Sequence, residues 1–191
     1  MDLSTITVAD FKAFFYRDFP YLPTYDPSAL YNAGERVYYS VSRLFYDCLV
    51  NGTTGITPGT DATVWLEVAD NIDNYIQDAD ISRAFLEAKV NLNQGLFTSD
   101  DNIRMGYLYL TAHYLCNDIR TASGGVGSSA LFPLMARSVG NVSENYGIPQ
   151  VYLDNPVYSF YTQSGYGMKY LSLVLPQLVG NIGWVQGWTN P

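Results

Sequence analysis

The chain has 191 residues, of which 48% are hydrophobic and 15% are charged, and ten basic against eighteen acidic residues give a net charge of −8. The basic residues are dispersed along the chain, whereas surfaces that bind nucleic acids or anionic membranes need clustered Lys and Arg. The composition therefore argues against both kinds of binding, and the length fits one domain that carries at most a small insert.

The first residues and the cysteines indicate a protein made in a reducing compartment. Asp2 stands where a signal peptide carries positive charge, and no stretch has the about 20 apolar residues that span a bilayer. Cys48 and Cys116 are too few for a disulfide framework, so both are expected to be reduced and packed as small hydrophobic side chains.

Aromatic residues make up 15% of the chain, with 17 Tyr, 9 Phe and 3 Trp. Tyr and Trp suit surfaces that become half-buried, because they offer a large contact area with few rotatable bonds. A Tyr-rich chain with few charges is therefore a candidate for covering much of its surface with other subunits, although a glycan-binding face has the same composition.

The first predicted element is a short helix over residues 7–17. Thr7 and Asp10 have the spacing of a capping box, with Asp in place of the usual Glu, and Phe residues recur behind them near helical spacing. Pro20 and Pro23 then end the helix, because proline cannot continue it.

Residues 28–69 form a separate predicted unit with a β pattern. Two runs of β-branched and aromatic residues, Glu35–Ser40 and Leu44–Val50, predict a hairpin, and a third short strand is predicted over Val64–Val68. Three short strands cannot enclose a large core, so a miniature aromatic core is expected. The residues expected in it are Tyr38, Tyr46 and Trp65.

This module resembles the small carbohydrate-binding modules found on chitinases and on virion proteins. Their pattern has a Tyr-x-x-Gly-x-x-Val-x-Tyr strand, a Tyr-x-Cys strand and a Pro-Gly loop that leads to Trp. It is occupied here by Tyr31, Gly34, Val37, Tyr39, Tyr46, Cys48, Pro58, Gly59 and Trp65. The resemblance implies that Tyr39, Tyr46 and Trp65 stack on sugar rings; the alternative is that these side chains are the module's own core.

Two helices are predicted after the module. The first covers residues 79–93, with an apolar stripe that begins at Ile81, and Gly95 ends it. The second covers about residues 101–121 and is apolar on two adjacent faces. A helix of that kind is buried on two sides, which is typical of the central helix of a bundle.

Two more helices are predicted near the C-terminus. Asn155 and Pro156 open a short one, with proline at its first helical position. The last helix follows until Pro176 and Gly180 break it.

The segments around these helices are predicted to contact partners. An extended strand is expected over residues 136–146, and its small polar residues leave it as a sheet edge or an arm that pairs with a neighbour. The tail at 180–191 carries Trp184 and Trp188, and exposed Trp is costly unless a partner covers it. The predicted assembly interface consists of Arg137, Val139, Val142, Tyr146, Trp184 and Trp188.

The order of the helical elements resembles the head-tail connector adaptors of tailed bacteriophages, also called head completion proteins. The match covers roughly residues 1–20 and 70–191, and its most specific parts are Ala112-His113-Tyr114-Leu115 and Gly165-Tyr166-Gly167 with Tyr170. The resemblance implies a mainly helical subunit that forms a ring, usually twelve-fold, between the portal and the tail or stopper. An acidic lumen in that ring repels DNA and lets it slide.

Residues suited to catalysis or metal binding are sparse. A lone histidine such as His113 is more often a hydrogen-bonded packing residue than a ligand, and no Cys or His cluster completes a zinc site. Six acidic residues between positions 61 and 80 could attract a cation, but they lack the spacing of a calcium loop. They are therefore expected to form a solvated turn. These residues are Asp61, Glu67, Asp70, Asp73, Asp78 and Asp80. We therefore expect no enzyme activity, no cofactor and no metal.

Together these patterns predict an α+β fold, mainly α: a small helical bundle with an extended β arm and a C-terminal tail, plus an inserted three-stranded β module. The adaptor domain is expected at residues 1–27 and 70–191, and the β module at 28–69. The expected function is a structural adaptor in the virion neck, assembled in the host bacterial cytoplasm without a membrane partner. A glycan-binding decoration module of a virion or secreted protein is the alternative.

The expected partners follow from that position in the neck. They are further copies of the chain, the portal protein, and a tail, stopper or nozzle protein, with DNA passing through the lumen without specific binding.

Overall fold

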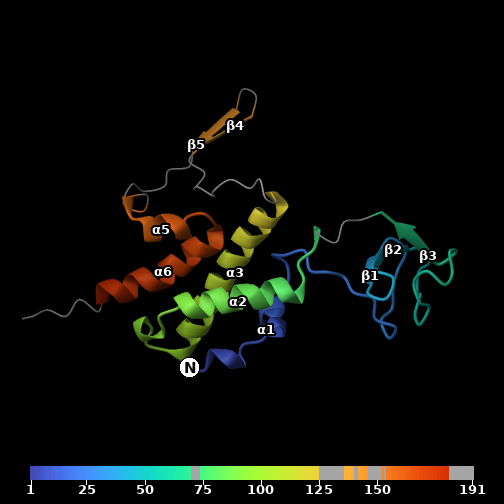
Figure 1. Cartoon of the computed structure of the whole chain (residues 1–191), viewed down its shortest axis with the longest axis horizontal. Coiled ribbons are helices and arrows are strands. Elements are labelled where there is room, and N and C mark those ends of the chain that lie inside the picture. Colours follow the sequence, from blue (N-terminus) through green and yellow to red (C-terminus); the bar gives the residue numbers. More distant parts are fainter. Residues whose placement is uncertain (70–73, 125–135, 140–141, 146–151, 153, 181–191) are drawn as a thin grey trace, which may run out of the picture. The chain divides into compact units, whose positions relative to one another are not determined.

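The fold is α+β and mainly helical, as predicted. The computed structural model describes residues 1–69, 74–124, 136–139, 142–145, 152 and 154–180. The chain divides into two compact units, whose elements are drawn in Figure 1. The helical unit comprises residues 1–14 and 79–191, and the β unit comprises residues 15–78.

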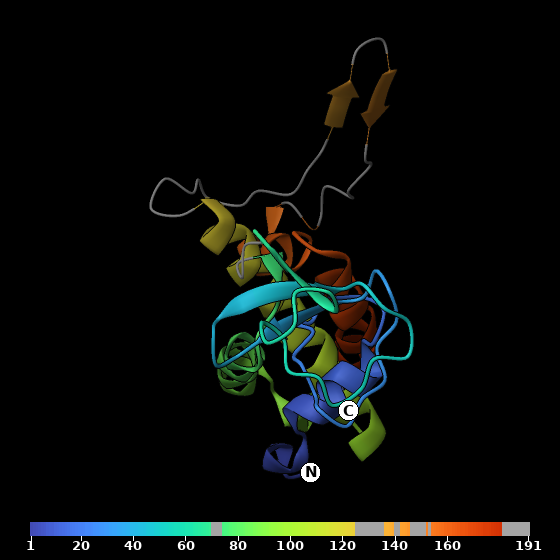
Figure 2. The same ribbon diagram turned by 90° about the vertical axis from the view of Figure 1, so that its right-hand side faces the viewer.

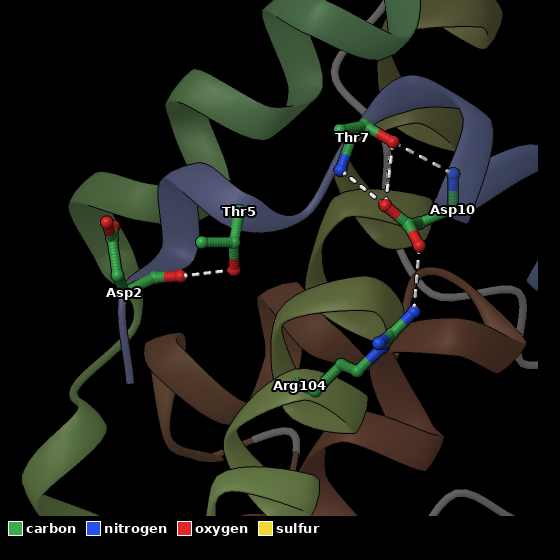
Figure 3. Close-up of polar contacts among 5 residues, drawn as sticks. All are labelled: Asp2, Thr5, Thr7, Asp10 and Arg104. Atoms are coloured by element: carbon green, nitrogen blue, oxygen red, sulfur yellow. Dashed lines mark hydrogen bonds and ion pairs between the residues drawn. The ribbon is translucent and has the colours of Figure 1, made fainter.

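The helical unit begins with η1 (Leu3–Thr5) and α1 (Val8–Phe14). The predicted capping box is confirmed, because one Asp10 carboxylate oxygen accepts hydrogen bonds from the Thr7 N–H at 2.9 Å and from the Thr7 hydroxyl at 2.6 Å. In return, Thr7 Oγ1 accepts from the Asp10 N–H at 3.2 Å. The other Asp10 oxygen accepts from Arg104 Nη2 at 3.0 Å, which ties the start of α1 to another helix (Figure 3).

Three longer helices, α2 (Asp78–Asn91), α3 (Asp100–Gly124) and α6 (Gly165–Gly180), build the core of this unit. Helix α3 is the central one, as predicted: the side chains of Leu108, Leu110 and Leu115 have no exposed surface. It packs along α6.

Aromatic contacts join α1 and α2 to this core. The Phe85 ring of α2 stacks on Tyr107 of α3 at a centroid distance of 5.3 Å, and the Tyr107 hydroxyl donates to the Phe85 carbonyl at 3.0 Å. Phe11 of α1 has no exposed surface and meets Phe85 edge-to-face at 5.9 Å.

The predicted start of α5 is confirmed, whereas the predicted break of α6 at Pro176 is wrong. η3 (Gln94–Leu96) follows α2, and α5 (Pro156–Tyr161) is capped by Asn155, whose side chain accepts from the Val157 N–H at 2.9 Å. Helix α6 continues through Pro176 to Gly180 instead of ending at the proline. Pro176 cannot donate to the Ser172 carbonyl, but both residues are exposed, so water can take that bond.

The segment predicted as one extended strand is a hairpin. β4 (Ala136–Val139) and β5 (Val142–Asn145) pair antiparallel, with Val139 opposite Val142 (Figure 2). The single-strand prediction was wrong because Gly140 and Asn141, between the two strands, are residue types favoured in two-residue hairpin turns.

The β unit contains an antiparallel sheet of β1 (Arg36–Tyr39), β2 (Leu44–Cys48) and β3 (Trp65–Val68), in that order. One face forms the core, which consists of Tyr31, Val37, Tyr46, Cys48, Val64 and Trp65. Tyr38 was predicted in this core, but side chains alternate along a strand, and Tyr38 instead contacts Phe45 at a ring distance of 5.3 Å.

Flanking segments enlarge the β unit beyond the predicted module at 28–69. The Tyr38 N–H donates to the Pro23 carbonyl at 2.6 Å, so the chain ahead of the module pairs with β1. The Ile76 N–H donates to the Pro20 carbonyl at 2.8 Å, and the Leu22 N–H donates to the Ile76 carbonyl at 3.1 Å. The entry and exit of the unit are therefore held side by side.

Removing the capping hydroxyl tests what anchors α1. We expect Thr7→Ala to lower the unfolding free energy by about 1 kcal/mol in urea denaturation, because the Asp10 N–H loses its acceptor. The control, Arg104→Ala, removes only a half-exposed ion pair and should cost a few tenths of a kcal/mol. A larger loss in Arg104→Ala than in Thr7→Ala would show that the ion pair, and not the cap, is the anchor.

Candidate functional site

His113, the residue singled out as a packing histidine, lies at a buried junction between α3 and the turn that joins α5 to α6. Its side chain has no exposed surface, and its Nδ1 lies 2.7 Å from Ser164 Oγ. Ser164 also caps α6, since its Oγ accepts from the Gly167 N–H at 3.0 Å. One hydroxyl therefore fixes both the start of α6 and the orientation of the imidazole.

The other imidazole nitrogen faces an amide. Nε2 of His113 lies 3.3 Å from the Asn117 amide nitrogen, and Asn117 Oδ1 is buried without a hydrogen-bond partner among the described residues. The same Asn117 nitrogen donates to Gln163 Oε1 at 3.3 Å, so the amide presents its N–H groups on this side and can donate to Nε2 of His113. With Nε2 as the acceptor, neutral His113 carries its proton on Nδ1 and donates it to Ser164 Oγ, so both nitrogens are bonded.

Aromatic rings surround His113 and set its protonation state. Phe160 lies perpendicular to the imidazole at 4.7 Å, with Tyr161 at 5.5 Å and Tyr114 at 5.8 Å. Burial, with a smaller contribution from the positive charge of Arg120, lowers the pKa of His113 to about 4. A neutral, hydrogen-bonded side chain without exposed surface holds helices together and cannot contact a substrate in solution.

Gly167 makes the junction possible. A Cβ atom placed there would lie 2.1 Å from the Tyr161 carbonyl oxygen and 2.7 Å from His113 Nδ1, closer than any side chain can approach. Arg120 closes the same junction, because its Nη1 donates to the Gln163 carbonyl at 2.6 Å. The partners of His113 were not predicted, although Ser164 three residues before Gly167 has the spacing of a helix cap.

The aromatic residues predicted to stack on sugars lie mostly inside the β unit. Trp65 is 2% exposed and Tyr46 is 4% exposed, and the Trp65 Nε1–H donates to the Ile56 carbonyl at 2.7 Å. Tyr25 and Tyr31 meet the Trp65 ring edge-to-face at 5.9 and 5.4 Å. These contacts leave no ring face of Tyr46 or Trp65 for a sugar, which corrects the predicted role of both. Tyr39 is half-buried against the same core.

The predicted assembly residues fall partly on the hairpin. Arg137 and Val139 belong to β4, and Val142 opens β5. Tyr146, Trp184 and Trp188 lie outside the described residues.

Neither a metal site nor a membrane span is found in the part of the chain that the structure describes. Its His, Cys, Asp and Glu residues form no group of three suited to an ion, and Asp61 binds the Thr63 N–H and hydroxyl instead. Asp70 and Asp73 lie outside the described residues. No helix built from the described residues has the length and hydropathy to cross a bilayer. Cys48 and Cys116 are both free thiols, as predicted.

Comparison with protein-family models, with curated proteins and with solved structures gave no match.

The close approach at Gly167 can be tested with a matched pair of glycines. We expect Gly167→Ala to lower the unfolding free energy by about 3 kcal/mol, because the new methyl group overpacks backbone that cannot move aside. Gly165→Ala, where the added carbon meets no atom within 4 Å, should be neutral or slightly stabilising. Equal urea midpoints for the two variants would contradict the proposed crowding at Gly167.

Burial of neutral His113 predicts a loss of stability in acid. The unfolded chain takes up a proton as the pH falls below about 6.5, whereas the folded chain resists protonation until about pH 4. Between these values the wild type should therefore lose about 3 kcal/mol of unfolding free energy.

The variant His113→Asn keeps an amide near Ser164 and has no titrating ring, so it should lack that contribution. The measurement is urea denaturation of both proteins across this pH range. The same pH dependence in the two proteins would place the acid sensitivity elsewhere.

Proposed function

We propose that this chain is a structural adaptor of the neck of a tailed bacteriophage, assembled from several copies as a ring between the portal and the tail, stopper or nozzle protein. The observation that carries the proposal is the His113 junction. The two segments with the most specific resemblance to connector adaptors, residues 112–115 and 165–170, are far apart in sequence and pack directly on each other there. Two motifs that resemble the same family and also contact each other in the fold support the adaptor proposal more strongly than either motif alone.

The charge distribution supports passage of DNA without binding. The β unit has nine acidic and three basic residues, a net charge of −6, and the helical unit carries the remaining −2. Along the sequence, neither unit has the run of Lys and Arg residues that typically binds phosphates. A ring whose subunits have this charge repels the phosphate backbone at its inner surface, and repulsion lets DNA slide during ejection.

Exposed apolar side chains give the helical unit surface that neighbouring subunits can cover. On α2, Leu86 is 67% exposed and Val90 is 85% exposed, and residues four apart lie on the same side of a helix. On α5, Val157 is 60% exposed. Placing these side chains against other subunits removes apolar surface from water, which favours assembly. The proposed assembly is a twelve-fold ring in the virion neck, built from copies made in the host cytoplasm.

The glycan-binding alternative receives less support. Of the three predicted sugar-stacking residues, Trp65 and Tyr46 are buried and only Tyr39 is partly accessible. A sugar-binding face needs open aromatic rings, so the aromatic residues of the β unit are better explained as its core.

Electron microscopy of the purified chain mixed with its portal tests the adaptor proposal. We expect a ring of density on one face of the portal, and no added density would overturn the proposal. Deleting residues 180–191 should abolish this attachment, because the two tail Trp residues are then missing, while the circular dichroism spectrum of the helices stays unchanged. Normal attachment of the truncated chain would remove the tail from the proposed interface.

A further inference from the structure

The β4–β5 hairpin presents two sheet edges, and we infer that each edge pairs with the hairpin of a second copy of this chain. In this arrangement β4 of one subunit lies beside β5 of the next, so that neighbouring hairpins form one continuous antiparallel sheet. The inference rests on the proposed ring and names the contact that joins its subunits.

The size of the hairpin is the first argument. Each strand has four residues, and the structure gives neither strand an extensive contact with any other described element. An isolated two-stranded hairpin is at best marginally stable in water, and stability requires a third strand or a packed hydrophobic face. A neighbouring strand supplies what this hairpin lacks.

The backbone of both strands is suited to such pairing. Residues 136–139 and 142–145 contain no proline, so every N–H in them can donate. In a two-stranded ribbon each strand bonds its partner on one side only, and alternate N–H and C=O groups point outward along the other side. Among the described residues, no strand pairs with either outer edge.

The charges select which edges meet. The register places Arg137 of β4 directly opposite Glu144 of β5. When copies are related by rotation, β4 of one subunit meets β5 of the next with Arg137 and Glu144 again at the same level. Pairing β4 with another β4 would instead bring two Arg137 residues close together, and like charges across strands are destabilising. The favoured contact is therefore head-to-tail, the type of interface that closes into a ring.

Disulfide trapping with single-cysteine additions tests this contact in the full-length chain. Two separately purified and differently tagged variants, Ser138→Cys and Ser143→Cys, are mixed at high concentration and oxidised. These two positions lie directly opposite each other in the register, and the variants keep Arg137 and Glu144 in place. A single added cysteine per chain prevents a bond within one hairpin. The wild type measures the background from its native thiols, of which Cys48 is buried and Cys116 is partly buried.

We expect a cross-linked dimer that contains one chain of each kind. It should exceed by about tenfold the dimer formed when Ser138→Cys is mixed with Asn145→Cys, because Asn145 lies two positions out of register with Ser138 and a disulfide requires close Cβ atoms. A dominant dimer of two Ser138→Cys chains, which keep Arg137, would overturn the head-to-tail order. Absence of the mixed dimer at every concentration up to the solubility limit would overturn the hairpin contact itself.

This outcome is separate from that of the adaptor proposal. Portal-bound rings without the mixed cross-link leave the adaptor proposal standing and remove the hairpin contact, whereas failure to bind the portal removes the adaptor proposal.

Discussion

The helical unit depends on one close backbone approach, at Gly167. At this position α6 comes so near to the Tyr161 carbonyl and to His113 that a side chain has no room. The same approach lets the Ser164 hydroxyl reach both the first turn of α6 and the imidazole. A histidine that is buried and neutral costs little only while both its nitrogens are bonded, so the glycine, the cap and the imidazole stabilise the junction as a group.

The sequence predicted those elements whose signals are local. Thr7 with Asp10, and Asn155 with Pro156, are cap patterns within one helical turn, and both helices begin where these patterns place them. The predicted helix end at Pro176 was wrong. Proline usually ends a helix, but this one lies on the exposed side of α6, where water can bond to the carbonyl group that proline leaves without a donor.

Other features depend on contacts between distant residues and had no comparable signal. His113 was correctly assigned as a packing residue from its isolation in the sequence, but its partner Ser164 is 51 positions away. The role of Trp65 could not be assigned from the sequence either, because an aromatic residue in a short strand can stack on a sugar or pack in a core. The contacts of its ring with Tyr25 and Tyr31 show that it packs in the core. The hairpin did have a signal, in Gly140 and Asn141, but the weak apolar pattern around them favoured a single strand.

The pairing of Ile76 with Pro20 and Leu22 has a consequence for how this protein can vary. Because the two ends of the β unit lie side by side and the unit has its own sheet and core, it can behave as an insertable domain. The chain on either side has to bridge only a short distance between the two ends. Excising the unit and joining the cut ends with a short linker, or transplanting it into a surface loop of another protein, disturbs little backbone on either side.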